Sequence, residues 1–514
     1  MFLNQLCNRT NLLYRIRQMS STTREFLANR PTYAQDVSKL QPFIDLAVDW
    51  QASHGVVLRA PQLSGADAPW LKAALTPAPV ALAPSPIPRT EFERVVQLQP
   101  ILNQLFHRIA NDHEFLVSTL ESLGSADEFT ARVFKMYLDQ RELNVEKPAV
   151  IGVHRSDYLI DAPAAEPASV PRAKQVEFNT IAASFASLSS LVGDLHRFLL
   201  ARTGYEGLIE SGSIEPSQLP TNESLTSIAD GIAAGFSLYG NSGAVVVMVV
   251  QPNERNVYDQ RWVETGLWEK HHIKTIRLSF AEVLEKCTLD ENNRLFINGE
   301  EIAVAYYRSG YAPTDFPTEQ EWQGRWLIEK SRTVSVPNLA YHLAGCKKIQ
   351  QVLAQPGVVE RFIDDLGTAD LVRECFVGLY PLDETKDGQD AVQTAKSNPD
   401  KYVVKPQREG GGYNTYGGDI PPLLEKLSAE ELRGYILMEL IKAPGFKSVL
   451  LRDGALFASE VVSELGIYGI WVSDASGSVV VNKHGGHLLR TKSSDVYEGG
   501  VAAGFAVIDS PLLV

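Results

Sequence analysis

Residues 405–418 read KPQREGGGYNTYGG and directly follow residues 402–404, an apolar run typical of a buried strand. The three consecutive glycines at 410–412 let backbone N–H groups approach a ligand closely, as loops that hold phosphate groups do. Lys405, at the end of the strand, supplies a positive charge for a phosphate. Glu409 supplies a carboxylate oxygen for the magnesium ion that accompanies ATP. We therefore expect a nucleotide loop, with the flexible turn that glycine runs also form as the alternative.

Two further pairs of side chains complete this chemistry. Glu177 and Asn179 in QVEFNTI, and Arg490 and Lys492 in HLLRTK, are each two residues apart on a predicted strand, so each pair lies on one face. Taken alone, either pair is explained as well by a solvated strand face. Together with the glycine-rich loop, they predict a site for Mg-ATP and an anionic second substrate that works by charge stabilisation.

Composition excludes several classes of protein. The chain has 514 residues, 44% of them apolar, which is enough for roughly two to four domains with a substantial core. A formal charge of −14 argues against an extended nucleic-acid or anionic-membrane surface. Its four cysteines contain no CxxC pair, so we expect a reducing compartment and no disulfide framework.

The chain is expected to be a soluble cytoplasmic protein. Its longest apolar run, residues 244–250, is far shorter than the roughly 20 residues of a membrane helix. The first 24 residues contain four arginines and no acidic residue, which weakly resembles an organelle transit peptide and leaves a targeted form as an alternative.

The hydropathy pattern changes along the chain and predicts its organisation. Helical periodicity covers 36–55, 89–115, 127–143 and about 221–239, and the proline-rich stretch 76–88 predicts an extended path. Residues 149–160 and 172–185 predict a strand hairpin, and a β/α region begins at 244. Within that region, Asn298 and Gly299 form the strongest hairpin-turn signal of the chain.

Several side chains that could bind a metal or react are more simply explained by structural roles. His484 and His487 form one HxxH pair, but zinc needs three or four ligands, so a loop role is favoured. Cys346 next to Lys347 is either a reactive thiol or a small buried residue, and the second is favoured. His107 is expected to be a satisfied or solvated helix residue.

These pieces occur in a familiar order. From about residue 30 to its end, the chain resembles the eukaryotic glutathione synthetase family of ATP-grasp ligases. The motifs that carry the resemblance are VHRSDY, VEFNTIAASF, NERNVYDQR, YYRSGY, LAGCKKIQ, KPQREGGGYNTYG, YILMEL, SELGIYG, NKHGGHLLRTK and EGGVAAGFAV.

The resemblance implies a fold and an assembly. The fold is mixed α/β (α+β), an ATP-grasp architecture with antiparallel sheets, a helical N-terminal part and a small parallel α/β substrate-binding domain. The family is homodimeric. The implied divisions of this chain are an N-terminal extension at 1–30, a helical and strand part at 31–243, a substrate-binding domain at 244–344 and a nucleotide-binding part with the glycine-rich lid at 345–514.

The resemblance also implies the site residues. Two Mg²⁺ ions per subunit are implied, with Glu177, Asn179 and Glu409 as ligands, and the catalytic cations are Lys347, Lys405 and Arg490. The implied ATP site consists of Glu177, Lys347, Lys405, Glu409, Gly410, Gly411, Gly412, Asn414, Tyr416, Met438, Glu439, Leu440, Ile441, Glu464, Lys492 and Glu498. The implied site for γ-glutamylcysteine and glycine consists of Arg155, Ser184, Glu254, Asn256, Gln260, Arg308, Tyr311, Arg490, Val501 and Ala502.

The sequence departs from the family pattern without losing a charged residue: its first 30 residues match no part of the family, and three further positions differ. Ala182 stands where relatives often carry serine, Tyr413 replaces an asparagine, and Glu498 stands where aspartate is common. The implied activity is ATP-dependent ligation of γ-glutamylcysteine with glycine through an acyl phosphate.

Two alternatives to this activity remain. One is another ATP-grasp carboxylate–amine ligase, such as one that uses β-alanine, which would differ at 254–260 and 308–311, where this chain matches the family. The other is a catalytically silent binding protein, which would have lost a metal ligand or a phosphate lysine, and this chain keeps them all.

Overall fold

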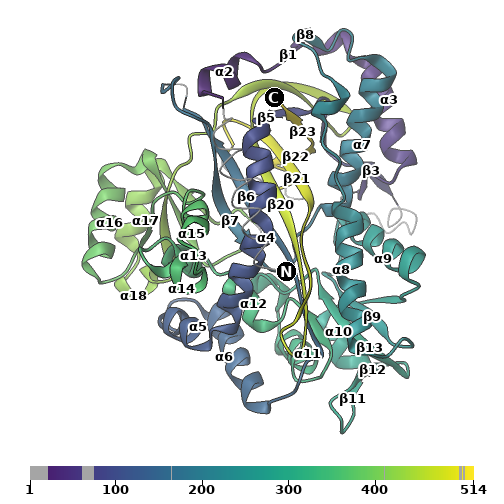
Figure 1. The fold of residues 1–514 in the computed structure, drawn as a ribbon, viewed down its shortest axis with the longest axis vertical. Helices are drawn as coiled ribbons and strands as arrows, with labels where there is room; N and C mark the ends of the chain where they lie inside the picture. The colour runs from purple at the N-terminus through teal and green to yellow at the C-terminus, as the bar shows by residue number, and fades with distance from the viewer. Residues whose placement is uncertain (1–20, 61–73, 164, 410, 497–499, 502–503) are drawn as a thin grey trace, which may run out of the picture.

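The computed structural model describes residues 21–514 except for 61–73, 164, 410, 497–499 and 502–503 (Figure 1). Three larger β-sheets organise the described chain, and helices cover their faces. Within the described residues no helix has the length and the apolar run needed to cross a membrane.

The largest sheet has seven strands in the order β19–β4–β22–β21–β20–β6–β7. All neighbours pair antiparallel except β22 and β4. The bounds are β4 Val80–Ala81, β6 Ala149–Asp161, β7 Arg172–Asn179, β19 Phe446–Arg452, β20 Ala455–Asp474, β21 Val479–Ser493 and β22 Ala506–Asp509. Segments from both ends of the chain therefore share one sheet. The predicted division at 345 does not separate sheets, and the domain bounds stay a prediction.

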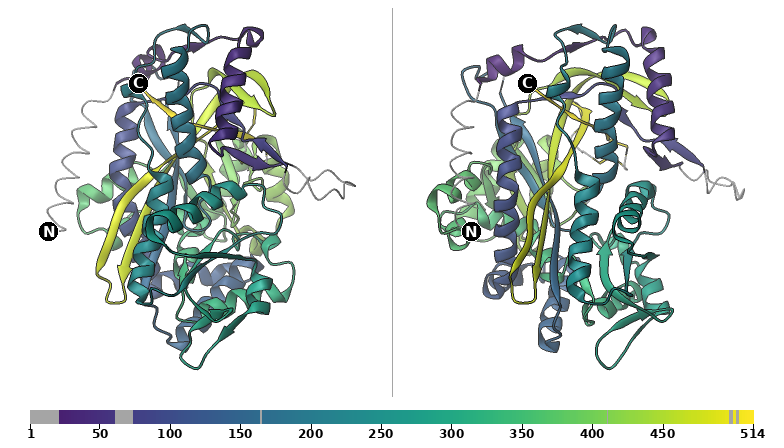
Figure 2. Two further views of the ribbon diagram at one scale, coloured as in Figure 1. Left: turned by 90° about the vertical axis from the view of Figure 1, so that its right-hand side faces the viewer. Right: turned by 45° about the vertical axis from the view of Figure 1, so that its right-hand side comes forward.

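Helices pack on both faces of β20 and β21 (Figures 1 and 2). Alternate residues of a strand point to opposite faces. Leu465 and Trp471 of β20 therefore share a core with helix α4 (Arg89–Asn111), whereas Ile470 and Val472 share a core with helices α7 (Ala186–Thr203) and α8 (Ser224–Tyr239).

A six-stranded sheet contains the predicted β/α region. Its order is β10–β9–β13–β12–β11, with β14 pairing β13. The four strands β9, β10, β13 and β14 are parallel, and helices on both faces bury their apolar residues, as expected for parallel strands. The bounds are β9 Val245–Val249, α9 Val257–His271, β10 Thr275–Leu278, α10 Phe280–Lys286, β11 Cys287–Leu289, β12 Leu295–Ile297, β13 Glu300–Tyr307, α11 Glu319–Glu329 and β14 Val334–Val336.

The predicted turn between β12 and β13 is confirmed. Asn298 has φ 51° and Gly299 has φ 81°, which is the left-handed backbone that a two-residue hairpin of this type requires.

A four-stranded antiparallel sheet, β15–β18–β16–β17, forms the lobe at the left of Figure 1. Val404 and Leu437 on one face pack against helices α16 and α17, whereas Val403 and Met438 lie on the opposite face. The bounds are β15 Leu379–Pro381, α16 Lys386–Ser397, β16 Tyr402–Pro406, β17 Thr415–Tyr416, α17 Ile420–Lys426, α18 Ala429–Leu432 and β18 Tyr435–Glu439.

The remaining elements connect these sheets. Short strand pairs join β1 with β8, β2 with β3 and β5 with β23. Their bounds, and those of the other helices, are α2 Thr23–Ala28, β1 Thr32–Tyr33, α3 Gln41–Ser53, β2 Val57–Arg59, β3 Leu75–Pro77, β5 Ser85–Ile87, α5 His113–Leu120, α6 Glu128–Leu143, β8 Ile209–Ser211, α12 Leu339–Ala344, α13 Lys347–Leu353, α14 Val358–Phe362, α15 Leu366–Arg373 and β23 Pro511–Leu513.

Most predicted elements occur, with shifted ends. The helix predicted from 36 begins at Gln41, where Pro42 occupies the first turn. The helix predicted over 89–115 is two helices, because Asp112 ends α4 and its side chain accepts a hydrogen bond from the Phe115 N–H of α5. The hairpin of β6 and β7 is confirmed, although β7 ends at Asn179 rather than 185.

Part of the predicted N-terminal extension is folded. Helix α2 begins with a capping box between Thr22 and Glu25, and Phe26 is buried in the core. The Thr23 N–H donates to the Ser169 carbonyl at 2.7 Å, which ties this helix to the β6–β7 connection.

Candidate nucleotide and substrate site

The strand register places Glu177 and Asn179, the predicted metal-ligand pair, on one face of the large sheet. Across β6 and β7, Glu177 lies opposite Asp157 and Asn179 lies opposite Arg155. Directly opposed residues of antiparallel strands have their side chains on the same face. One face of the sheet thus carries two carboxylates, an amide and a guanidinium group within two strands.

The predicted cationic pair belongs to the same sheet. On β21, Arg490 lies opposite Glu464 of β20, and Lys492 lies opposite Val462. The Arg490 guanidinium forms an ion pair with the Glu464 carboxylate. Since β20 lies between β21 and β6, the sheet order brings Arg490 close to Glu177 and Asn179.

A cavity of about 440 Å³ collects most of the predicted site residues. Its wall comes from the large sheet, from the four-stranded sheet and from loops after β9 and β13. The predicted residues on its wall are Arg155, Glu177, Asn179, Ser184, Glu254, Asn256, Arg308, Tyr311, Lys347, Lys405, Glu409, Gly411, Asn414, Tyr416, Met438, Glu439, Leu440, Ile441, Glu464, Arg490, Lys492 and Val501.

Five predicted residues are not placed on this wall. Gly410, Glu498 and Ala502 lie outside the described residues. Gly412 follows Gly411 in the loop, and the two have φ values of 83° and 75°, a conformation that glycine adopts without strain. Gln260 is fully buried on α9, where its side chain accepts a hydrogen bond from Arg277.

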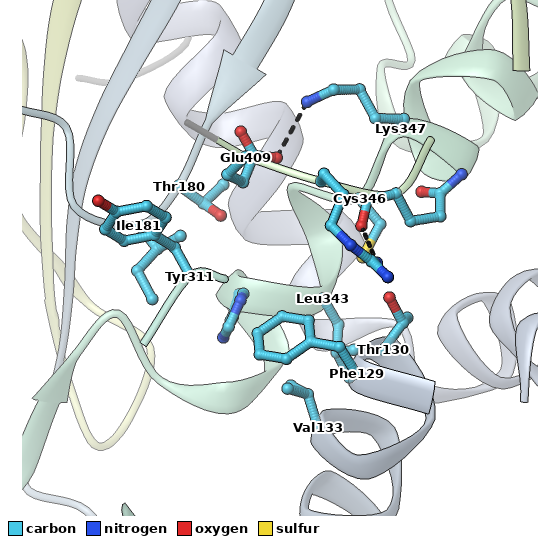
Figure 3. A pocket seen from close by; sticks show the side chains of 13 residues that line it. Phe129, Thr130, Val133, Thr180, Ile181, Tyr311, Leu343, Cys346, Lys347 and Glu409 are labelled. Atoms are coloured by element: carbon cyan, nitrogen blue, oxygen red, sulfur yellow. Dashed lines mark hydrogen bonds and ion pairs between the residues drawn. The ribbon is translucent and has the colours of Figure 1, made fainter. Parts of the chain in front are cut away.

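Lys347 pairs with a carboxylate of the large sheet and with Glu409 of the glycine-rich loop, and Figure 3 shows the second of these contacts. It is the first residue of α13, and its Nζ lies 2.9 Å from a Glu177 oxygen and 3.0 Å from a Glu409 oxygen. Burial opposes its charge, but the two carboxylates raise the pKa of Lys347. Although burial also opposes ionisation of Glu177, Lys347, Lys405 and Arg490 together hold its pKa well below the usual range.

Lys405 supplies a second cation from the four-stranded sheet. It lies on β16 and is almost fully buried, and its Nζ donates to the Val176 carbonyl of β7 at 3.0 Å. Burial lowers the pKa of Lys405, so a nearby anion such as phosphate would favour its charged form.

The donor set of Glu177, Asn179 and Glu409 fits a magnesium ion. Both carboxylates bind the same Lys347 amine, so they lie close together. The Asn179 Nδ2 donates to the Arg155 carbonyl at 3.2 Å and to Asp157 at 2.9 Å, which turns the amide oxygen away from these partners. Two carboxylates and an amide oxygen are the hard ligands that Mg²⁺ prefers.

Glu409 is expected to destabilise the ligand-free chain at alkaline pH. Burial and the neighbouring Glu177 raise the pKa of Glu409 from 4.5 to about 7, although Lys347 opposes this shift. The folded state therefore binds this proton more tightly than the unfolded state, and stability falls as pH rises from 4.5 through 7. Glu409→Gln is expected to raise the melting temperature at pH 8 by about 1–3 °C, and the gain should shrink towards pH 5.5.

Differential scanning fluorimetry without ligands checks this expectation. Glu384→Gln is the control, because Glu384 pairs with Arg433 at the surface, outside the cavity. A lower melting temperature for Glu409→Gln at pH 8 would contradict the raised pKa.

Strands β18 and β17 carry several of the residues predicted to bind ATP. Met438 of β18 lies opposite Val403, and Tyr416 of β17 also lies opposite Val403, so both strands border the cavity beside Lys405. The Glu439 carboxylate accepts hydrogen bonds from the Gly378 N–H at 3.2 Å and the Tyr380 hydroxyl at 2.9 Å, which fixes its position.

Four of the residues predicted to bind the dipeptide lie where the parallel strands of the six-stranded sheet end. Glu254 and Asn256 follow β9, and Arg308 and Tyr311 follow β13. Ligands commonly bind at the carboxyl ends of such strands. Asn256 is buried, and its Oδ1 has no hydrogen-bond partner among the described residues, so it is available to a ligand.

Two buried carboxylates that bind predicted site residues were not among the residues predicted from the sequence. Asp259 accepts a hydrogen bond from Arg308 at 2.9 Å and also binds the Phe185 and Ser187 N–H groups, so it fixes an arginine and the turn after β7. Asp157 bridges several side chains of the large sheet and is treated below. The position of Asp157 two residues after Arg155 was the available signal.

The loop role predicted for His484 and His487 is wrong, because both belong to strand β21. His487 is buried edge-on against Phe92, and the described part of the chain contains no group of three His, Cys, Asp or Glu side chains that could hold a metal ion. Cys346, predicted to be a small buried residue, is partly buried. Burial raises the pKa of Cys346 to about 12, so its thiol stays protonated. The His107 Nδ1 lies 2.9 Å from the Tyr341 hydroxyl.

Comparison with known proteins identifies the family. The family model described as eukaryotic glutathione synthase, ATP binding domain, matches residues 37–513. The chain belongs to the eukaryotic glutathione synthase family.

Curated members of this family are similar over most of their length. The chain is 42% identical over 440 residues to the chloroplastic glutathione synthetase of Solanum lycopersicum, covering 85% of this chain and 78% of the relative. It is 39% identical to the glutathione synthetase of Xenopus laevis and 38% identical to that of Homo sapiens, each time covering 93% of this chain and 98% of the relative.

A solved structure shares the fold. The apo structure of a glutathione synthetase-like effector from Globodera pallida superposes with a TM-score of 0.72 at 23% identity and covers 94% of this chain and 98% of that chain. The predicted mixed α/β architecture is thereby confirmed as the glutathione synthetase-like fold.

Proposed function

We propose that this chain joins γ-glutamylcysteine to glycine and converts ATP to ADP and phosphate, which makes it a glutathione synthetase. The observation that carries the proposal is that one cavity of about 440 Å³ is lined by both sets of predicted residues. It brings together the cations and carboxylates of a Mg-ATP site with the arginines of an anionic-substrate site. The identity of the substrates is inferred from membership of the eukaryotic glutathione synthase family.

The chemistry follows from what an amide bond requires. A carboxylate is a poor electrophile, because its leaving group would be an oxide ion. An oxygen of the cysteinyl carboxylate attacks the γ-phosphorus of ATP, the bond to ADP breaks, and an acyl phosphate forms. The glycine amine then attacks the acyl carbon, phosphate leaves, and the nitrogen loses a proton to become the amide.

Lys347, Lys405 and Arg490 are the side chains proposed to offset the negative charge that develops on the transferred phosphoryl group. Each is positioned before substrate binds: Lys347 by Glu177 and Glu409, Lys405 by the Val176 carbonyl, and Arg490 by Glu464. Magnesium bound by Glu177, Asn179 and Glu409 would neutralise phosphate charge. The loop at 405–414 is proposed to close over the acyl phosphate and exclude water.

The site for the two smaller substrates is proposed on the other side of the cavity. Arg155, Arg308 and Tyr311 suit the carboxylates of γ-glutamylcysteine, and Arg490 with Val501 suits the glycine end. Asn256 offers its unpaired Oδ1 to the dipeptide amine. A homodimeric, cytoplasmic enzyme is part of the same proposal.

The acceptor is expected to be glycine rather than β-alanine. Relatives that prefer β-alanine tend to change the alanine pair of the GGVAAG motif, which this chain keeps at 502 and 503. One added methylene in a fitted pocket costs about 10- to 200-fold in specificity constant.

Product formation with glycine and with β-alanine, measured by mass spectrometry at saturating γ-glutamylcysteine and Mg-ATP, tests both function and acceptor. Glutathione formation with a clear preference for glycine supports the proposal. Equal rates, or a preference for β-alanine, contradict the acceptor, and the absence of any condensed product contradicts the ligase.

A further inference from the structure

Asp157 is a buried residue of the large sheet and is hydrogen-bonded to three of the predicted site residues, Arg155, Asn179 and Arg490. It belongs to β6, and its side chain is only 1% exposed. Its Oδ1 accepts from Arg155 Nε at 2.6 Å, and its Oδ2 accepts from a terminal Arg155 nitrogen at 2.8 Å, from Asn179 Nδ2 at 2.9 Å and from a terminal Arg490 nitrogen at 3.1 Å. One buried carboxylate thus binds side chains from β6, β7 and β21.

We propose that Asp157 is a positioning residue that sets the spacing between the dipeptide site and the glycine site, a role that rests on the proposed function. Arg155 and Arg490 both line the cavity. Asp157 is not part of the cavity wall that the described residues form. Asp157 therefore acts through the two arginines. Because one carboxylate holds both guanidinium groups, the two substrate carboxylates that they bind are held at a fixed separation.

Asp157 binds one edge of the Arg155 guanidinium group, which leaves the other terminal nitrogen for a contact with substrate. Asp157 binds the Nε and one terminal nitrogen, a bidentate arrangement that fixes the plane of the guanidinium group. The other terminal nitrogen lies 3.3 Å from the Ser184 carbonyl, beside the cavity. The guanidinium edge that Asp157 does not bind therefore lies beside Ser184, a predicted dipeptide-site residue.

A glycine on the intervening strand makes room for this cluster. Asp157 lies opposite Gly466 of β20, the strand between β6 and β21. A Cβ atom at position 466 would lie 2.7 Å from the Asp157 Oδ1 and 2.8 Å from the Arg155 Cδ, closer than side chains pack. The missing side chain therefore lets Arg490 of β21 reach across β20 to Asp157 on β6.

The positive charges of Arg155 and Arg490 explain why a neutral residue at position 157 is expected to disrupt the cluster. Without the carboxylate, the buried Arg155 would lose its bidentate partner and would face Arg490 with no charge between them. Glu464 would still pair with Arg490. An uncompensated buried guanidinium group either moves or recruits another anion, and both displace the substrate contacts.

Two variants test the proposal independently. Asp157→Asn keeps the shape but removes the charge and puts an N–H₂ group against donors. Gly466→Ala keeps every charged residue and displaces the cluster by steric contact alone. The control is Asp161→Asn on the same strand, because Asp161 accepts from the Lys442 N–H away from the cluster.

Both test variants are expected to raise the KM for γ-glutamylcysteine and for glycine by at least about tenfold, while the dissociation constant of ATP, from calorimetry, stays within about threefold. Calorimetric binding of γ-glutamylcysteine alone should weaken to a similar degree. Asp161→Asn should match the parent.

Several results would overturn the positioning role. They are unchanged KM values in either variant, a loss of ATP binding as large as the loss of dipeptide binding, or a lower kcat with both KM values unchanged. If Asp157→Asn does not fold, Gly466→Ala decides the question. Failure of the proposed function is distinguishable, because the parent chain itself would then neither bind γ-glutamylcysteine nor form glutathione.

Discussion

Replacing Lys347 with methionine is expected to lower kcat/KM for ATP by at least about a thousandfold, or roughly 4 kcal/mol of transition-state stabilisation. Its ammonium group is the proposed partner of the transferred phosphoryl group. It also separates Glu177 and Glu409, to which it lies at 2.9 and 3.0 Å. Methionine keeps a similar length but leaves two carboxylates facing each other without a cation. Steady-state kinetics with ADP detection measures the loss.

The adjacent Lys348 offers a matched control for this variant. It lies on the same helix, and its Nζ is 3.7 Å from a carboxylate oxygen of Asp383, outside the cavity wall. Lys348→Met should keep turnover within about threefold of the parent. Equal losses in the two variants, with circular dichroism unchanged, would mean that Lys347 has no special role in the reaction.

Glu409→Gln is expected to reduce turnover by at least about a hundredfold, or roughly 2.7 kcal/mol, while the fold stays intact. The change removes a full charge from the proposed magnesium ligands but preserves the size of the side chain. Since the same variant is expected to be more heat-stable at pH 8, activity and stability should change in opposite directions.

Turnover at increasing Mg²⁺ concentration, with Glu384→Gln as the surface control, measures this effect. A turnover close to that of the parent at saturating Mg²⁺ would contradict the assignment of Glu409 as a ligand. A loss of both activity and thermal stability would point to a structural role instead.

Local chemistry allowed much of the fold to be predicted. The Asn298 and Gly299 turn requires left-handed backbone that few residues adopt, and the structure has it. The spacing of Glu177 and Asn179, and of Arg490 and Lys492, placed each pair on one strand face because side chains alternate along a strand. The register of β6, β7, β20 and β21 shows that these faces belong to one sheet.

The remaining features depend on pairing between distant segments, which no local pattern specifies. Strand β4, with Val80 and Ala81, pairs with β19 and β22, more than 350 residues further along the chain. The spacing of Asp157 and Arg155 indicates a shared strand face, but the contact of Asp157 with Arg490 depends on strand pairing across Gly466. Gln260, placed in the dipeptide site by resemblance, is not on the described cavity wall, and its side-chain oxygen accepts a hydrogen bond from Arg277, so its role stays a prediction.

The most direct test of the proposed reaction is the release of ADP by the purified chain with γ-glutamylcysteine, glycine and Mg-ATP together, compared with reactions that lack one of the two smaller substrates. An acyl phosphate protected from water should give one ADP for each glutathione, and ADP release should fall to background when γ-glutamylcysteine is omitted. Omission of glycine should leave at most one ADP per active site. Continued ADP release without γ-glutamylcysteine, or ADP release without glutathione in the complete mixture, would contradict a coupled ligase.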